Sequence, residues 1–145
     1  MAKVVLVTGG SRGIGRVTAM RLLMNGYTVA FTYHTSRDAA REFEAEASGT
    51  LGEAPPRLVS YQGDVRDEKW NTTIVDEIVT RFGSLDALVN NAGIRRDALM
   101  FNMTAEHWSE VINTNLTGAW AMTKPSSCSR ESRSPSFVRT PTPRA

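Results

Sequence analysis

The chain of 145 residues has 17 Lys and Arg residues against 15 Asp and Glu, a formal net charge of +2. This length fits one domain and is short for a doubly wound enzyme with two nucleotide-binding halves. Residues 125–145 hold four Arg and one Glu, so residues 1–124 keep 13 basic and 14 acidic residues and lack the excess positive charge of a polyanion-binding body. The lone Cys128 excludes a disulfide or a multi-cysteine metal site within one chain.

The sequence carries no signal for export or membrane insertion. The N-terminus leads directly into an apolar strand, with neither a basic region nor a cleavage site, and no apolar run approaches the roughly 18 residues of a membrane span. The two histidines, His34 and His107, have no second ligand or nucleophile at a suitable spacing, so we expect no metal site. We expect a cytoplasmic protein without a membrane or nucleic-acid partner.

A glycine-rich turn follows the first predicted strand, residues 4–7. The turn has the spacing Gly9-x-x-x-Gly13-x-Gly15 and leads into a predicted helix that ends at Gly26. Glycines allow a tight turn and the close approach of a pyrophosphate, and the helix N-terminus adds unpaired N–H groups. The alternative is a turn without a ligand, because this spacing differs from the G-x-G-x-x-G fingerprint.

Two more strands and an exposed helix are predicted in the next third of the chain. Residues 27–33 and 58–61 are rich in β-branched and aromatic side chains, which favour strands. Residues 36–47 have the alanine and charge content of a helix.

Asp67 is placed to cap a third helix, in which apolar residues recur every four positions over 70–82 and which Gly83 ends. A fourth strand is predicted over 85–89, and Thr104 opens a last helix. Strands that alternate with helices imply a parallel sheet with right-handed crossovers. The predicted fold is therefore α/β, a Rossmann-type doubly wound sheet over residues 1–124 that stops after the fourth strand and its helix.

Four segments resemble the short-chain dehydrogenase/reductase family in the order in which that family has them. They are Thr8 to Gly15 at the first turn, Asp64 after the third strand, Asn90-Asn91-Ala92-Gly93 after the fourth, and Asn115 in the following helix. The chain looks most like the 3-oxoacyl-[acyl-carrier-protein] reductases over residues 3–124. The resemblance implies a reductase of 3-oxoacyl thioesters on an acyl carrier or coenzyme A, and homo-oligomers for the full-length form.

The resemblance also implies a set of cofactor-binding residues. The glycine turn approaches the cofactor phosphates, Asp64 accepts a hydrogen bond from adenine, and residues 90–93 flank the ribose and nicotinamide side. As turn-favouring residue types, Asp64 and the Asn90-Asn91 pair have plain turn or capping roles as alternatives. The full set of expected contacts is Thr8, Gly9, Ser11, Arg12, Gly13, Ile14, Gly15, Tyr33, Arg37, Asp64, Val65, Asn91, Ala92 and Gly93.

The end of the second strand favours NADP(H) over NAD(H). A carboxylate there would hold the ribose 2′-hydroxyl and repel a 2′-phosphate, and the sequence Tyr33-His34-Thr35-Ser36-Arg37 contains none. Arg12 and Arg37 supply guanidinium groups suited to a phosphate. The alternative is that both arginines are solvated surface charges.

The catalytic residues of the family are largely missing from the 145 residues. The family uses a Ser and a Tyr-x-x-x-Lys, and none of the three tyrosines is followed four residues later by Lys. Asn115, which in the family helps to hold a water of the proton relay, remains alone, and hydrogen bonding to local backbone is its alternative role. We expect a chain that is catalytically deficient by itself, or else a non-catalytic NADP-binding or regulatory protein.

Composition changes abruptly after Lys124. Residues 125–145 contain six Ser, four Pro, four Arg and two Thr, which predicts a disordered tail. Our hypothesis is an out-of-frame translation of a G+C-rich gene; a truncated pseudo-enzyme or a basic interaction tail are the alternatives. Such a stop would leave the fourth strand with an open edge and expose Leu116 and Trp120, which favours aggregation or a partner surface.

Overall fold

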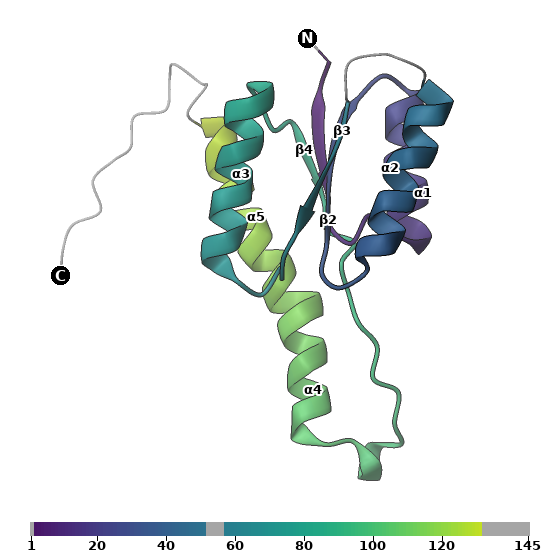
Figure 1. Ribbon diagram of the computed structural model, residues 1–145. Coiled ribbons are helices and arrows are strands. Elements are labelled where there is room, and N and C mark those ends of the chain that lie inside the picture. Colours follow the sequence, from purple (N-terminus) through teal and green to yellow (C-terminus); the bar gives the residue numbers. More distant parts are fainter. Residues whose placement is uncertain (1, 52–56, 132–145) are drawn as a thin grey trace, which may run out of the picture.

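The computed structural model describes residues 2–51 and 57–131, which form a three-layer α/β sandwich (Figure 1). All strand pairs in the central sheet are parallel, and the strand order is β3-β2-β1-β4. The predicted alternation of strands and helices is thereby confirmed. The strands are β1 (Val4–Val7), β2 (Thr28–Tyr33), β3 (Leu58–Gln62) and β4 (Ala87–Val89).

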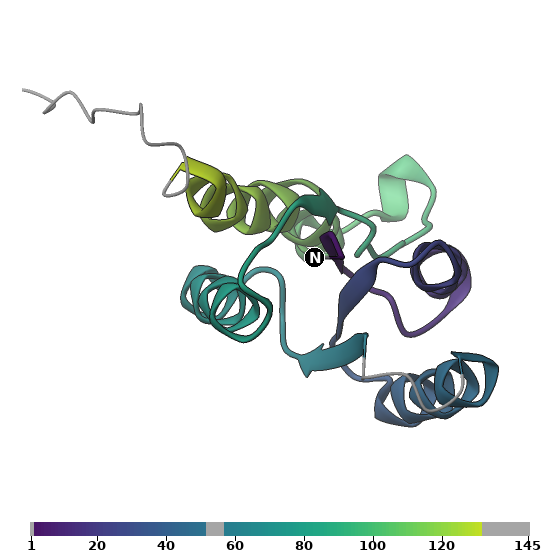
Figure 2. The same ribbon diagram turned by 90° about the horizontal axis from the view of Figure 1, so that it is seen from above.

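Helices cover both faces of the sheet, as the view from above shows (Figure 2). One face carries α1 (Gly13–Met24) and α2 (Arg37–Leu51), and the other carries α3 (Glu68–Phe82) and α5 (Gly118–Glu131). The helix predicted from Thr104 is a rod of three parts that ends in α5. Its first two parts are α4 (Ala105–Ile112) and a π-helical turn, η2 (Asn113–Thr117); the short 3-10 turn η1 (Met100–Asn102) precedes them.

The sheet separates two apolar cores because side chains alternate along each strand. Val4 and Leu6 of β1 face α3 and α5, where they pack in one cluster with Ile78 and Met122. Val5 and Val7 face α1 and α2 and pack with a cluster that contains Phe43. β1 is therefore buried on both sides, as a central parallel strand is expected to be.

Capping residues fix both ends of α3 and the start of α4 at the residues predicted for them. The Asp67 carboxylate accepts hydrogen bonds from the N–H groups of Lys69 and Trp70, at 2.9 and 3.1 Å, and so begins α3. Gly83 ends α3 with a left-handed φ of 78°. The Thr104 hydroxyl accepts from the N–H of His107 at 3.2 Å and begins α4. These caps confirm the predicted boundaries.

β4 is shorter than the predicted strand over 85–89. Its first ladder position is Ala87, paired with Val5. Before it, the Asp86 carboxylate accepts from the Val4 N–H at 2.8 Å, and the Asp86 N–H donates to the Val4 carbonyl at 2.8 Å. A side chain thus replaces one strand-to-strand bond, which a count of apolar residues does not detect.

The prediction of disorder from residue 125 onward is wrong as far as Glu131, because α5 runs on to that residue. Pro125 has no N–H to donate within the helix. The hydroxyls that follow bond back into the helix, from Ser126 to the Met122 carbonyl at 2.8 Å and from Ser127 to the Thr123 carbonyl at 2.9 Å. Composition alone predicted disorder because it ignores these bonds and the burial of Ser126. The rest of the tail, residues 132–145, lies outside the described residues.

The side of the sheet that ends in β4 is open. Within the described residues β4 pairs only with β1, so its other edge has no strand beside it. Leu116 and Trp120 have exposed fractions of 65% and 54%. Both observations confirm the predicted open edge and apolar surface. Across the described part of the chain, every helix is too short or too polar to cross a lipid bilayer.

Candidate functional site

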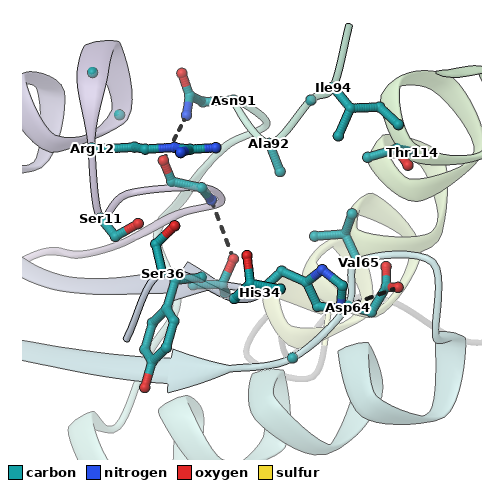
Figure 3. Close-up of a pocket in the computed structure, with 18 of the residues that line it drawn as sticks. Ser11, Arg12, His34, Ser36, Asp64, Val65, Asn91, Ala92, Ile94 and Thr114 are labelled. Atoms are coloured by element: carbon teal, nitrogen blue, oxygen red, sulfur yellow. Dashed lines mark hydrogen bonds and ion pairs between the residues drawn. The ribbon is translucent and has the colours of Figure 1, made fainter. Parts of the chain in front are cut away.

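A cavity of about 480 Å³ opens at the carboxyl ends of the strands (Figure 3). The chain passes from β1 to β2 and β3 on one side, and then crosses to β4 on the other side of β1. This is the topological switch point at which open α/β sheets bind ligands. Segments that follow all four strands line the cavity, among them Arg12, His34, Asp64 and Asn91.

The glycine turn after β1 requires glycine for two different reasons. Gly13 has φ = +55°, and a Cβ added there would meet no heavy atom within 4 Å, so its backbone faces open space in the cavity lining. At Gly15 an added Cβ would lie 2.3 Å from the Gly9 carbonyl oxygen, which is too close for any side chain. Gly13 therefore leaves the turn open to a ligand, and Gly15 allows α1 to pack against the turn.

The N-terminus of α1 is suited to an anion. Arg12 occupies the N-cap position without a side-chain cap, and the first turn of the helix contains no acidic residue. The initial N–H groups and the positive end of the helix dipole are thus not neutralised by the helix itself. The exposed Arg12 side chain adds a positive charge beside the cavity.

Asn91, after β4, connects the glycine turn to the segment that follows the neighbouring strand. Its Nδ2 donates to the Thr8 and Gly9 carbonyls at 2.9 and 3.1 Å. In return the Thr8 hydroxyl oxygen accepts from the N–H groups of Asn91 and Ala92, both at 3.0 Å. Thr8 is buried and does not line the cavity, so its hydroxyl contributes by holding the lining residues Asn91 and Ala92 in place.

The end of β2 presents hydroxyl groups and a histidine. The Thr32 hydroxyl accepts from the Gly9 N–H at 3.3 Å, which ties the glycine turn to β2. Tyr33, His34 and Ser36 line the cavity. No carboxylate is among the lining residues that this segment supplies, as the sequence predicts.

Arg37 lies beside that segment and outside the cavity lining. Its Nη2 donates to the Gln62 amide oxygen at 2.8 Å, and Gln62 in turn donates to the His34 carbonyl at 3.2 Å. The guanidinium is therefore held next to the end of β2. A role in binding phosphate remains a prediction.

Asp64 is engaged by a neighbouring arginine. The Nε of Arg66 donates to both carboxylate oxygens, at 3.0 and 2.9 Å, and the Arg66 N–H donates to Oδ1 at 2.9 Å. These hydrogen bonds, chiefly those of the Arg66 side chain, lower the pKa of Asp64. His34 Nε2 lies 3.8 Å from Oδ2. The carboxylate is therefore kept ionised and fixed in one orientation at the edge of the cavity.

Asn115 sits in the π-helical turn η2 and bonds to a distant loop. Its Oδ1 accepts from the Ile94 N–H at 2.8 Å, and its Nδ2 donates to the Ile94 carbonyl at 2.9 Å. The alternative of bonding to local backbone does not describe these contacts, since 21 residues separate the partners. Single π-helical turns within helices often mark functional positions.

The cavity brings together most of the residues predicted from the sequence. Lining it are Gly9, Ser11, Arg12, Gly13, Ile14, Gly15, Tyr33, Asp64, Val65, Asn91, Ala92 and Gly93. Thr8, Arg37 and Asn115 lie outside the lining and contact residues beside it.

Several lining residues were not predicted. Those in the last part of β2 and after β2 and β3 lie at strand ends, so the rule that ligands bind at carboxyl ends was the available signal for them. The others come from the loop after β4 and from the α4 rod, whose position depends on the folded chain. The missed residues are Thr32, His34, Thr35, Ser36, Gly63, Arg66, Ile94, Arg96, Glu110 and Thr114. Among the described residues no three His, Cys, Asp or Glu side chains group as metal ligands.

Comparison with known proteins identifies the family to which this arrangement belongs. The family model for short chain dehydrogenases matches residues 3–130, most of the chain and past Lys124. The chain belongs to the short-chain dehydrogenase family. It is 44% identical over 125 residues to an acetoacetyl-CoA reductase of Paracoccus denitrificans, covering 86% of this chain and 48% of that protein. It is 43% identical over 122 residues to the 3-oxoacyl-[acyl-carrier-protein] reductase FabG of Staphylococcus aureus strain Mu50, covering 83% and 47%.

Solved structures of short-chain dehydrogenases share the fold. A short-chain dehydrogenase from Burkholderia cenocepacia J2315, crystallised with NADP, superposes with a TM-score of 0.79 at 34% identity, covering 88% of this chain and 50% of that one. A dehydrogenase/reductase from Sinorhizobium meliloti 1021 gives 0.81 at 34% identity, covering 89% and 50%. The chain thus spans about half the length of the relatives that it matches.

Proposed function

We propose that this chain is the NADP(H)-binding half of an oxidoreductase that reduces a 3-oxoacyl thioester to the 3-hydroxyacyl product. The observation that carries the proposal is the glycine turn with an open Gly13 at the switch point between β1 and β4. The names of the matched relatives support the thioester class, as acetoacetyl-CoA reductase and 3-oxoacyl-[acyl-carrier-protein] reductase. A cytoplasmic location is part of the same proposal.

The residues around the cavity fit a dinucleotide. The volume of about 480 Å³ lies within the range of small-molecule sites. A pyrophosphate would lie on the N–H groups of the Gly13 turn and the α1 N-terminus. Asp64 would accept a hydrogen bond from an exocyclic amino group of adenine, and Asn91 would hold the turn rigid beneath the cofactor.

The end of β2 supports the phosphorylated cofactor. A 2′-phosphate placed at this end of the strand would meet the hydroxyls of Thr35 and Ser36, with His34, Arg12 and Arg37 nearby. A carboxylate at the same place would select the free 2′-hydroxyl instead. The charge around the cavity therefore favours NADP(H).

The bound nicotinamide would supply the hydride. From this chain, Asn115 is the residue that we assign to the proton relay of the family. The Ser and the Tyr-x-x-x-Lys that polarise and protonate the carbonyl are not among residues 1–145. A tyrosine with its usual pKa near 10 protonates a substrate poorly at neutral pH without a lysine and cofactor charge, so we infer that the chain alone does not turn over.

A non-catalytic NADP-binding or regulatory protein is the second candidate, because residues 1–145 supply the lining of the cofactor cavity without a Tyr-x-x-x-Lys among them. The two candidate functions predict different coding sequences after codon 124. If another reading frame past codon 124 encodes a Ser followed by Tyr-x-x-x-Lys, the parent protein is a reductase. If resequencing confirms the present frame and no such block follows it, the non-catalytic candidate is favoured.

Titration of the 145-residue chain with NADPH and NADH, followed by nicotinamide fluorescence, tests the proposed function. We expect NADPH to bind at least about tenfold more tightly, a difference of about 1.4 kcal/mol. The matched variant is Ser36→Asp, which puts a carboxylate at the end of β2 and keeps a side chain able to cap α2. It should weaken NADPH binding and leave NADH binding nearly unchanged. Equal affinity of the wild type for both cofactors, or no binding of either, contradicts the proposal.

A further inference from the structure

The loop after β4 crosses one side of the cavity without regular secondary structure. Residues 90–99 form no helix or strand, and Ala92, Gly93, Ile94 and Arg96 from this loop line the cavity. The position of this loop therefore depends on hydrogen bonds that side chains make to it. Asn91 anchors the start of the loop on the glycine turn. The Asn115 amide bonds both polar backbone atoms of Ile94.

A second link to the helix rod lies two residues further along. Arg96 Nε donates to Glu110 Oε2 at 2.8 Å, joining the loop to α4. The two side chains are each a little under half exposed, and both residues line the cavity. Glu110 precedes Asn115 by five residues on the rod. The loop is thus attached to α4 and η2 at two points on the cavity side.

The loop after β3 lines the same cavity as Glu110. In that loop Arg66 bonds to the Asp64 carboxylate through side-chain and backbone hydrogen bonds. Asp64 is the main cause that raises the pKa of Arg66, and the charge of Glu110 adds the smallest contribution. Within the part of the chain that the structure describes, the one direct ion pair of Glu110 is therefore the pair with Arg96.

We propose that Glu110 is a positioning residue that holds the loop after β4 against α4, at the wall of the cavity, through its ion pair with Arg96. Among the described lining residues, Glu110 supplies the one carboxylate that comes from α4 and η2, so no other lining residue of these elements can replace it as the partner of Arg96. The effect of Glu110 on the loop is independent of the proposed function. Its effect on NADPH binding rests on the function proposed above.

Limited trypsin digestion of the full chain tests the loop directly, because trypsin cuts after arginine. A bond next to a tethered arginine is cut only when the loop opens, so the rate follows the population of the open form. Glu110→Gln should raise the rate of cleavage after Arg96 about three- to fivefold, the range expected for one partly exposed ion pair. Glu106→Gln, one turn earlier on α4, is the matched control and should leave this rate unchanged.

NADPH titration of the same variants tests the cavity. Glu110→Gln should weaken binding about threefold or more, and Arg96→Gln should do the same. If the two residues act through one link, the double variant should bind about as weakly as either single one. Unchanged cleavage in Glu110→Gln overturns the link, and faster cleavage with unchanged NADPH affinity overturns the positioning role. If the wild type binds no NADPH, the proposed function fails while the cleavage rates still decide the link.

Discussion

The two sides of β1 differ in how they are held together. On the β2 side, the strand residues 28–32 are buried, and α1 and α2 cover them with an apolar cluster that includes Phe31 and Phe43. On the β4 side, Ala87 is exposed, α4 contains no buried residue, and Trp120 is half exposed. Packing defines the first side. Hydrogen bonds from Asn91, Asn115 and Arg96 define much of the second.

This difference explains how a cofactor cavity forms at the junction. The glycine turn joins β1 to α1, and its backbone is tightly packed because Gly15 lies directly against the Gly9 carbonyl oxygen. The loop after β4 lies on the β4 side, where hydrogen bonds of Asn91 and Asn115 hold it in position. The wall that the glycine turn forms, where we propose that the phosphates bind, is therefore expected to be the stiffer of the two.

The largest contrast is expected between a buried and an exposed apolar residue. Ile78→Ala removes a fully buried side chain of α3 and should lower the free energy of unfolding by about 2–5 kcal/mol. Leu116→Ala, on the open side, should change it by less than about 0.5 kcal/mol. Urea unfolding followed by circular dichroism measures both values. Similar losses in the two variants would show that the open side is packed in solution.

A glycine comparison tests the fixed shape of the turn. Gly15→Ala places a Cβ 2.3 Å from the Gly9 carbonyl oxygen and should cost about 1–3 kcal/mol through overpacking, together with a loss of NADPH binding. Gly49→Ala, in α2 with open space around it, should be neutral or stabilising by up to about 1 kcal/mol. Melting temperatures and cofactor titrations report the two effects. Normal NADPH binding by Gly15→Ala would refute the assigned role of the turn.

Asn91 joins the two sides, and its removal should affect both. Asn91→Ala leaves the Thr8 and Gly9 carbonyls without their side-chain donor, at a cost of about 1–3 kcal/mol. Asn25→Ala removes a comparable bond at an exposed helix end and should cost less. Hydrogen exchange of amides 9–15 and 92–94 would locate the change. Faster exchange in only one of these segments would contradict the joining role.

The smallest expected effect is the acid titration of Asp64. Arg66 lowers its pKa in the folded chain, so the stability that it contributes is present above the ordinary value near 3.9 and disappears as the pH falls through the lower folded value. Arg66→Gln should move the titration of the Asp64 carboxyl carbon upward, as measured by NMR. An unchanged midpoint in this variant would mean that other groups hold the carboxylate.

The sequence predicted the features that depend on neighbouring residues better than the contacts between distant ones. Apolar periodicity and the capping residues Asp67 and Thr104 set element boundaries that the structure confirms, because they act over a few residues. The glycine turn predicted one wall of the cavity for the same reason. Glu110 and Arg96 escaped prediction because their contact joins residues 14 apart through a loop without periodicity. The extension of α5 to Glu131 was missed because composition does not show that this helix packs on the sheet and α3, with Met122 and Ser126 buried.

Chemical shift mapping with NADP⁺ on the ¹⁵N-labelled chain is the most direct test of where the ligand binds. We expect shifts in the amides of residues 9–15, 64–65 and 91–94, which surround the cavity at the switch point. The outer groove of α1, lined by Val17, Arg21 and Tyr27, should remain unshifted and serves as the internal reference. Shifts confined to that groove, or no shifts at saturating NADP⁺, would contradict a cofactor site between β1 and β4.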